Sequence, residues 1–244
     1  MSSSNLKFLI LMCYYNRPNM AGAYALPSVL NSTYQNWELI VVDDGSPNPI
    51  SPVLEILGMD TDSRVHLIET NDTEEQKREM GGSRLGEFWN YAMLESDADV
   101  AIMLCDDDAL HQDYLSRLSV WLDARPEVFH CHSHVIPFNP FDGKKLEEIQ
   151  PTPFHINSNE HVHGVLTLDA SQVAWKIACS RSGRALFDTP RTKGLDASIY
   201  RGLGDNYGLC APTCFVGQYK GIYHCMLGKR AQEFSGEMDL PYMP

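Results

Sequence analysis

Four short apolar runs in the first half of the chain constrain its fold more than any other feature. They occupy residues 7–15, 37–44, 64–69 and 100–107. Each is continuously apolar and ends in polar residues, the pattern of a strand buried on both faces of a mostly parallel sheet. Helix-like segments accompany them at residues 20–32, 49–58, 83–96 and 111–124. This alternation predicts an α/β fold, an open and mostly parallel sheet flanked by helices.

One residue disagrees with this pattern. Pro27 falls inside the first helical segment, where a proline costs about 3 kcal/mol unless it starts a helix or a kink. We therefore expect the helix proper to begin near Pro27 and residues 18–26 to be looser.

The second half of the chain is less regular. We expect a strand at 128–138, a loop to about residue 163, a partly helical segment at 168–183, and a helix at 195–208 that ends in a glycine cap. We treat residues 1–244 as a single domain with a division near residue 109, in which each half shapes one ligand site.

Composition narrows the class of protein. A formal net charge of −13 argues against non-specific nucleic-acid binding, which needs a basic surface. The seven cysteines are scattered and none has CxxC spacing, so we expect reduced thiols. No apolar run is long enough to span a bilayer, and no signal-peptide cleavage site follows the first one. These features predict a soluble, cytoplasmic protein without a membrane span; they do not indicate its oligomeric state.

Acidic residues follow two of the apolar runs. Asp43 and Asp44 end the second run, and residues 106–108 are three consecutive aspartates after the fourth. The ligand crevice of an open α/β sheet lies beyond the carboxyl ends of its strands. Carboxylates about 4 Å apart repel by about 4 kcal/mol at an effective dielectric constant of about 20, and a divalent cation such as Mg²⁺ or Mn²⁺ removes that repulsion. The alternative is that the aspartates cap helices and face solvent.

Longer segments carry a resemblance to a known family. The chain contains, in this order, YYNRP, SVLNSTYQNWELIVVDDGS, GGSRLGEFWNYAM and CDDDAL. This series resembles GT-A-fold glycosyltransferases of the large inverting family two, and it covers about the first 125 residues. The resemblance implies a GT-A, Rossmann-like sheet with a nucleotide-sugar-binding half at about 1–108 and an acceptor-binding half at about 109–244. It also implies transfer of a sugar from a nucleotide-diphospho-sugar to a glycan or other hydroxyl acceptor, with inversion.

The resemblance assigns roles in donor binding. Tyr15 is expected beside the nucleotide base, with Cys13 near it. Asp43 is expected to accept a hydrogen bond from the base imide, which favours UDP over GDP. Arg84 is expected to contact base or phosphate. The full set of expected donor-binding residues is Cys13, Tyr15, Arg17, Asp43, Asp44, Arg84 and Asp106.

The family's acidic D-x-D motif is altered in this chain. Its usual first position holds Cys105. Either Asp106 reaches the ribose and Asp107 the metal, or the register shifts and Asp106 and Asp108 form the D-x-D. We favour Asp107 as the primary Mn²⁺ or Mg²⁺ ligand, with Asp108 close behind.

A third metal ligand is expected from the C-terminal region. His224 follows the last strand-like run, where many relatives place a histidine that reaches the metal or diphosphate. Lys229 or Arg230 could neutralise phosphate from the same loop. A histidine without such a role is the alternative.

A general base is also implied. Asp196 resembles the catalytic aspartate of the family's E-D-x-x-x-x-x-R-L helix, with Arg201 retained but Leu195 in place of the usual glutamate. The alternative is that Asp196 caps the helix. Asp169 is the second candidate for the base and Asp188 the third.

Other readings of the chain have weaker support. Histidines 130, 132 and 134 share one side of a strand, but no fourth zinc ligand accompanies them at a recognisable spacing. The polar segment 71–83 suggests a solvated or mobile loop. Phosphoryl transfer has no P-loop to support it. A degenerate GT-A domain that binds nucleotide or glycan without transfer stays open, because Cys105 and Leu195 stand at normally acidic positions.

Overall fold

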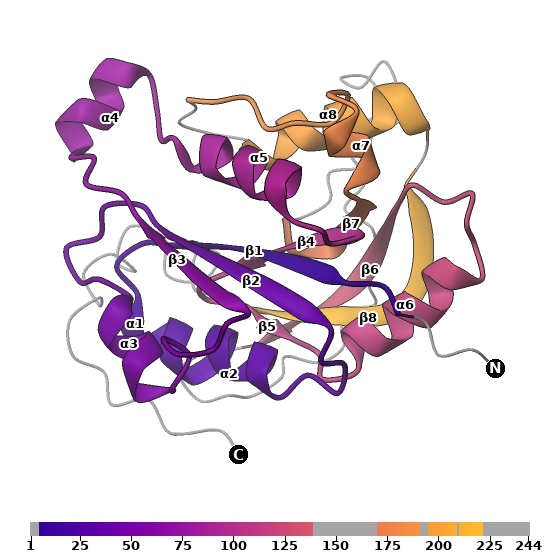
Figure 1. The fold of residues 1–244 in the computed structure, drawn as a ribbon, viewed down its shortest axis with the longest axis horizontal. Helices are drawn as coiled ribbons and strands as arrows, with labels where there is room; N and C mark the ends of the chain where they lie inside the picture. The colour runs from indigo at the N-terminus through magenta and orange to yellow at the C-terminus, as the bar shows by residue number, and fades with distance from the viewer. Residues whose placement is uncertain (1–4, 139–169, 191–194, 209, 222–244) are drawn as a thin grey trace.

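An eight-stranded sheet forms the centre of the protein (Figure 1). The computed structural model describes residues 5–138, 170–190, 195–208 and 210–221. The strands are β1 Phe8–Tyr14, β2 Trp37–Asp43, β3 Val65–Glu69, β4 Val100–Cys105, β5 Ala109–Leu110, β6 His130–Phe138, β7 Val173–Lys176 and β8 Ala211–Gly221. Their order across the sheet is β3-β2-β1-β4-β7-β6-β8-β5.

Helices cover both faces of this sheet. They are α1 Pro18–Met20, the π-helical turn η1 Ala21–Ala25, α2 Leu26–Leu30, α3 Ser51–Ile56, α4 Glu74–Met80, α5 Leu85–Glu95, α6 Tyr114–Asp123, the 3-10 turn η2 Ala170–Gln172, α7 Ala178–Arg181 and α8 Leu195–Tyr207. Helices α2, α3 and α6 pack on one face, and α5, α7 and α8 pack on the other (Figure 1). None of the helices in the described residues is both long and apolar enough to cross a membrane.

Strand β1 shows why the apolar runs are continuous. Phe8, Ile10 and Met12 belong to the core on the α2 side, whereas Leu9 and Leu11 belong to the core on the α5 side. All five side chains are completely buried. Because successive side chains of a strand point to opposite faces, a strand with helices on both sides needs apolar residues at every position. The predicted α/β architecture is confirmed.

The pairing of the strands gathers the carboxyl ends of three of them. Strand β1 pairs in parallel with β2 on one side and with β4 on the other. Tyr14 is in register with Asp43, and Cys13 with Cys105. The chain goes outward from β1 to β2 and β3 and then returns to β4 on the other side of β1. A crevice for ligands is expected beyond the carboxyl ends of the strands where the order reverses in this way. Both acidic segments of the sequence lie at this edge of the sheet.

Some elements differ from the expectation. Residues 18–26 are helical, since α1 begins at Pro18 and continues through η1 into α2. Pro27 sits in the first turn of α2, directly after the wider π-helical turn, where its missing N–H disturbs the helix least. Segment 168–183 contains strand β7 between two short helical turns, and β5 was not expected.

One further expectation is wrong and two others agree with the structure. The polar segment 71–83 is not a plain loop, because it contains α4, which starts with a capping box between Thr73 and Gln76. The glycine cap of the helix at 195–208 is confirmed, since Gly208 follows α8 with a φ of +81°. Six cysteines in the described residues are free, as predicted for reduced thiols.

Candidate functional site

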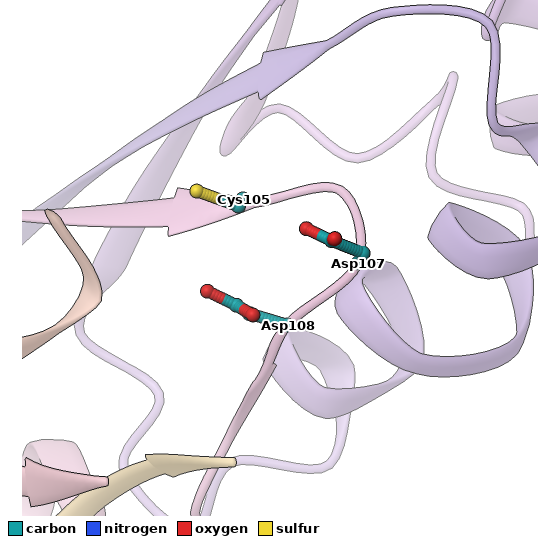
Figure 2. A group of neighbouring side chains, drawn as sticks. All are labelled: Cys105, Asp107 and Asp108. Atoms are coloured by element: carbon teal, nitrogen blue, oxygen red, sulfur yellow. The ribbon is translucent and has the colours of Figure 1, made fainter. Parts of the chain in front are cut away.

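The three consecutive aspartates form a buried turn, here named the acidic turn (residues 106–108). It begins where β4 ends at Cys105 and leads directly into β5, so that Asp107 lies on the bend and Asp108 lies directly before β5 (Figure 2). The exposed fractions of Asp106, Asp107 and Asp108 are 0%, 3% and 0%. The alternative in which these aspartates face solvent is therefore wrong.

Two cations form ion pairs with the acidic turn. The guanidinium of Arg17 contacts Asp106 (NH2 to Oδ1, 2.6 Å) and Asp107 (NH1 to Oδ2, 2.7 Å). Lys220, from the end of β8, lies 3.3 Å from Asp108 Oδ2. The backbone N–H of Tyr15 also donates to Asp106 Oδ2 at 3.0 Å. Buried charges are stable only when they are paired in this way.

Burial dominates the protonation of this turn. It raises the pKa of Asp106 to about 7, against the opposing charge of Arg17, while the neighbouring carboxylate of Asp107 raises it further. Burial alone would lower the pKa of Arg17, but the two carboxylates outweigh that effect and raise it. Arg17 is therefore a permanent cation within the site.

The residues suited to hold a metal come together at this turn. The potential ligand atoms of Cys105, Asp107 and Asp108 all lie within 4.8 Å of one another (Figure 2). Among the described residues this is the one group of three or more His, Cys, Asp or Glu side chains with such spacing. Its two carboxylates suit Mg²⁺ or Mn²⁺. A hydrogen bond with Cys13 and burial raise the pKa of the Cys105 thiol, so the carboxylates are the first ligands available.

The two aspartates of the second acidic segment, Asp43 and Asp44, differ in their hydrogen bonding. Asp43 is 2% exposed, and its Oδ1 and Oδ2 accept hydrogen bonds from the backbone N–H groups of Ser46 (2.9 Å) and Ile50 (3.0 Å). Both oxygens of Asp43 thus hold the loop that follows β2. This differs from the expected contact between Asp43 and a base. In Asp44, by contrast, Oδ1 accepts no hydrogen bond from the described residues.

Asp44 belongs to a small group of polar residues beside Tyr15, here named the Tyr15 cluster (Tyr15, Asp44, Thr70, Asp72 and Lys77). Lys77 lies 3.1 Å from Asp44 Oδ2, and its Nζ is 5.0 Å from the centre of the Tyr15 ring. Tyr15 is 41% exposed. Burial raises the pKa of Asp44, although Lys77 opposes this effect.

The Tyr15 cluster contains unsatisfied polar atoms. Asp44 Oδ1, Thr70 Oγ1 and Asp72 Oδ2 are buried and have no hydrogen-bond partner among the described residues. Such atoms are rare in folded proteins and often mark a ligand site. Sequence reasoning missed Thr70, Asp72 and Lys77; the signal that could have found Lys77 is the Thr-x-x-Gln capping box at residues 73–76, which indicates a helix.

The ion pair that Arg84 forms is with Glu87, although Asp72 of the Tyr15 cluster also contributes to raising the Arg84 pKa. Arg84 caps α5, and its guanidinium pairs with Glu87 at 2.8 Å and 3.1 Å. The ring of Phe88 lies 5.2 Å from its guanidinium carbon. Cys13, in contrast, lies beside Cys105 on the adjacent strand. The structure therefore brings together six of the seven expected donor-binding residues at one sheet edge, with Arg84 on the helix beyond it.

The candidate base lies on a helix next to α5. Asp196 is the second residue of α8 rather than the residue before it. A methyl group built on Gly86 would lie 2.8 Å from the side chain of Leu195, so the first turns of α8 and α5 are in contact. Asp188 precedes α8, and its N–H donates to Ser198 Oγ at 2.9 Å. Asp169, His224, Lys229 and Arg230 lie outside the described residues.

The histidines of β6 are buried rather than arranged around a metal. His130 and His132 are 5% and 7% exposed. In the part of the chain that the structure describes, they are not among the side chains with metal-ligand spacing. Burial lowers the pKa of His130 to about 4, and the neighbouring His132 adds to this effect.

This burial predicts an acid-sensitive fold. The unfolded chain protonates His130 near pH 6.5, whereas in the folded chain it stays neutral down to about pH 4. The unfolded state therefore binds more protons as the pH falls through this range, and the free energy of unfolding decreases. We expect His130→Gln to remove up to about 3 kcal/mol of this pH dependence. Urea unfolding at pH 7.5 and pH 4.5 measures it; an equally steep dependence in the variant would contradict the prediction.

The comparison with protein-family models identifies one family. The model of the family described as Glycosyl transferase family 2 matches residues 9–175. Protein CgeD of Bacillus subtilis (strain 168) is 27% identical over 122 residues, which are 50% of this chain and 28% of CgeD. The match therefore covers less than a third of the length of that relative.

Solved structures of similar fold are also longer than this chain. The structure of S. aureus TarS 1-349 has a TM-score of 0.65 and 15% identity, and the match covers 91% of this chain and 63% of that one. Its complex with UDP-GlcNAc gives a TM-score of 0.62, 13% identity, and coverage of 88% and 58%. The mannosyltransferase PcManGT from Pyrobaculum calidifontis, in complex with GDP-Man and Mn²⁺, has a TM-score of 0.60 and 14% identity. The match covers 94% of this chain and 60% of that one. At these identities the likeness concerns the fold, and the matched part is about three fifths of each of these proteins.

Proposed function

Since this chain belongs to glycosyl transferase family 2, as the match over residues 9–175 shows, we propose that it transfers a sugar from a nucleotide-diphospho-sugar to an acceptor hydroxyl. The base and ribose would lie against the Tyr15 cluster, and the diphosphate would lie at the acidic turn. The similarity to proteins solved with UDP-GlcNAc and with GDP-Man and Mn²⁺ supports this class of donor.

One observation carries the proposal: Tyr15 lies between the acidic turn and the Lys77–Asp44 ion pair. Its backbone N–H donates to Asp106 at 3.0 Å, and its ring lies beside Lys77, which is paired with Asp44. A single residue at the end of β1 thus joins a place for a planar base to a place for charged phosphates. A nucleoside diphosphate likewise has a planar base at one end and charged phosphates at the other.

The roles of the acids follow from their partners. Asp106 is proposed for the ribose. Asp44 is proposed for the base in place of Asp43, whose two oxygens are already hydrogen-bonded within the loop. Asp107 and Asp108 would hold Mn²⁺ or Mg²⁺, with His224 as a further ligand. A metal bound there would neutralise the negative charge that develops on the leaving diphosphate.

The chain's own residues supply the remaining steps. Arg17, a permanent cation between Asp106 and Asp107, would orient diphosphate oxygens and share their charge. Asp196 is proposed as the base that takes the proton from the acceptor hydroxyl as it attacks, with Asp169 as the alternative. Attack on the face opposite the leaving group would invert the anomeric centre. The acceptor half would begin after the acidic turn, at about residue 109.

Thermal unfolding with UDP, GDP, CDP and TDP, each with and without Mn²⁺, tests this proposal. A ligand at about 100 times its dissociation constant adds about 2.7 kcal/mol to the free energy of unfolding. We expect stabilisation by one diphosphate that requires Mn²⁺, and release of that nucleotide from the matching nucleotide-sugar. Stabilisation without release from any nucleotide-sugar would support the alternative, a degenerate domain that binds without transfer. No stabilisation in any mixture would contradict the donor site itself.

A further inference from the structure

We propose that Lys77 determines which nucleobase the site accepts, by donating to a ring carbonyl next to the ring N–H that Asp44 accepts. The ligand class is therefore a base with such a lactam edge, uracil or guanine, rather than cytosine or adenine. This inference rests on the proposed function, which places the base beside Tyr15.

Lys77 is unusual among the lysines of a helix surface because it is only 8% exposed. Its ammonium contacts Asp44 Oδ2 at 3.1 Å and the Asp44 backbone oxygen, and it lies 5.0 Å from the centre of the Tyr15 ring. Its remaining contact is with Glu74 at 3.3 Å, whose side chain is 67% exposed. The bond to Glu74 is the outermost of the three, so it is the one that a ligand oxygen would replace.

Asp44 supplies the hydrogen-bond acceptor that would lie beside the Lys77 donor. Asp44 Oδ1 is buried without a hydrogen-bond partner among the described residues, and the same is true of Thr70 Oγ1. Thr70 is itself 9% exposed. Gly45 keeps these groups close together, because a methyl group on it would lie 2.5 Å from the backbone oxygen of Asp72 and 3.5 Å from Thr70 Oγ1. Lys77 occupies Oδ2 of Asp44 and the side chain of Ser83 lies near the same carboxylate, but Oδ1 still lacks a donor among the described residues, and a base N–H would supply it.

If the position of the base ring is fixed, Asp44 and Lys77 together can distinguish one nucleobase from another. With its ring beside Tyr15 and its ribose at Asp106, a base would present its central edge atom to Asp44 and the next atom to Lys77. In uracil and guanine these atoms are an N–H and a carbonyl oxygen, which match a carboxylate and an ammonium. In cytosine and adenine the central atom is a ring nitrogen with a lone pair, which a carboxylate repels. Leaving buried polar groups unmatched is the strongest source of such selectivity.

The competing explanation is purely structural. Lys77 could simply anchor α4 to the loop after β2, and its ammonium would then occupy space that a base needs. The two explanations predict opposite effects of removing the charge. A recognition residue loses affinity and selectivity together, whereas an anchor that blocks the site gains affinity for every base or leaves the preference unchanged.

Isothermal titration with UDP, GDP, CDP and ADP in the presence of Mn²⁺ separates them. The variants are Lys77→Met, Lys77→Arg and, as a matched control, Lys176→Met. Lys176 also lies beside an aromatic ring, 5.6 Å from the centre of Phe129, and donates to the Pro126 oxygen, but it is on β7, away from the Tyr15 cluster. Comparison of two nucleotides within one variant cancels any general loss of stability, which thermal unfolding without nucleotide reports separately.

We expect the wild type to prefer UDP or GDP over CDP and ADP. Lys77→Met should weaken binding of the preferred nucleotide by roughly tenfold to a hundredfold, the effect of losing a hydrogen bond to a charged group, while CDP binding changes little. Lys77→Arg should retain part of the preference, and Lys176→Met all of it. An unchanged ratio in Lys77→Met, or tighter binding of all four nucleotides, would overturn the inference alone. A wild type that binds none of the four would overturn the proposed function and the inference with it.

Discussion

Replacing Asp107 by asparagine is expected to reduce the rate of sugar transfer by about a thousandfold. A metal contributes several kcal/mol of charge stabilisation in the transition state, and each ~1.4 kcal/mol corresponds to a factor of ten in rate. Asparagine keeps the shape of the side chain but loses the negative charge that attracts the cation. The measurement is nucleotide release from the matching nucleotide-sugar over a series of Mn²⁺ concentrations, in which Asp107→Asn should also need more Mn²⁺.

A control variant at the opposite end of β4 makes this test specific. Asp99 precedes β4 at its opposite end and accepts a hydrogen bond from the Lys7 N–H at 2.8 Å. Asp99→Asn should therefore transfer sugar at close to the wild-type rate. If Asp107→Asn also keeps that rate, the metal is not held by Asp107, and Asp108→Asn becomes the decisive variant.

The second large effect is expected for Asp196→Asn, with turnover reduced by roughly a hundredfold to ten-thousandfold, the usual contribution of a general base. This loss should come without any change in the binding of nucleotide and Mn²⁺, because Asp196 lies on α8 and not on the acidic turn. That separation of turnover from donor binding distinguishes Asp196→Asn from Asp107→Asn. Steady-state rates and titration of the donor nucleotide on the same preparation measure it.

Asp205→Asn is the matched control, since Asp205 is an exposed aspartate near the other end of α8. It should leave turnover unchanged. Full activity in Asp196→Asn would remove Asp196 from the role of base and move the test to Asp169 and Asp188.

The sequence predicts the layered core well because the evidence for it is local. Strand β1 is apolar at consecutive positions, and that pattern alone requires cover on both faces. The acidic turn could be predicted for a similar reason, since three adjacent carboxylates after a buried strand need cations. The partners of those carboxylates could not be predicted equally well. Lys220 is 112 residues from Asp108 in the sequence, and only the pairing of β5 with β8 brings them together.

The proposed exchange of roles between Asp43 and Asp44 could not be predicted for a different reason. Both follow the same apolar run, and nothing in the residue types says which carboxylate turns back into the loop. The hydrogen bonds from Ser46 and Ile50 decide it, and they depend on the path of the loop after Gly45, which has a φ of +69°. The helix that carries Lys77 was missed because its polar composition conceals a capped α-helix.

The pairing of β5 with β8 limits how this protein could be recombined with its relatives. Ala109 and Leu110 follow the acidic turn directly and pair with Tyr219 and Gln218 near the end of the described chain. The N-terminal half and the C-terminal half thus contribute strands to one sheet and are not separate domains joined by a linker. A chimera that took its C-terminal half from another family member would inherit a foreign neighbour for β5 and a foreign partner for Asp108. Changes of acceptor by segment exchange would have to carry β8 and the acidic turn across together.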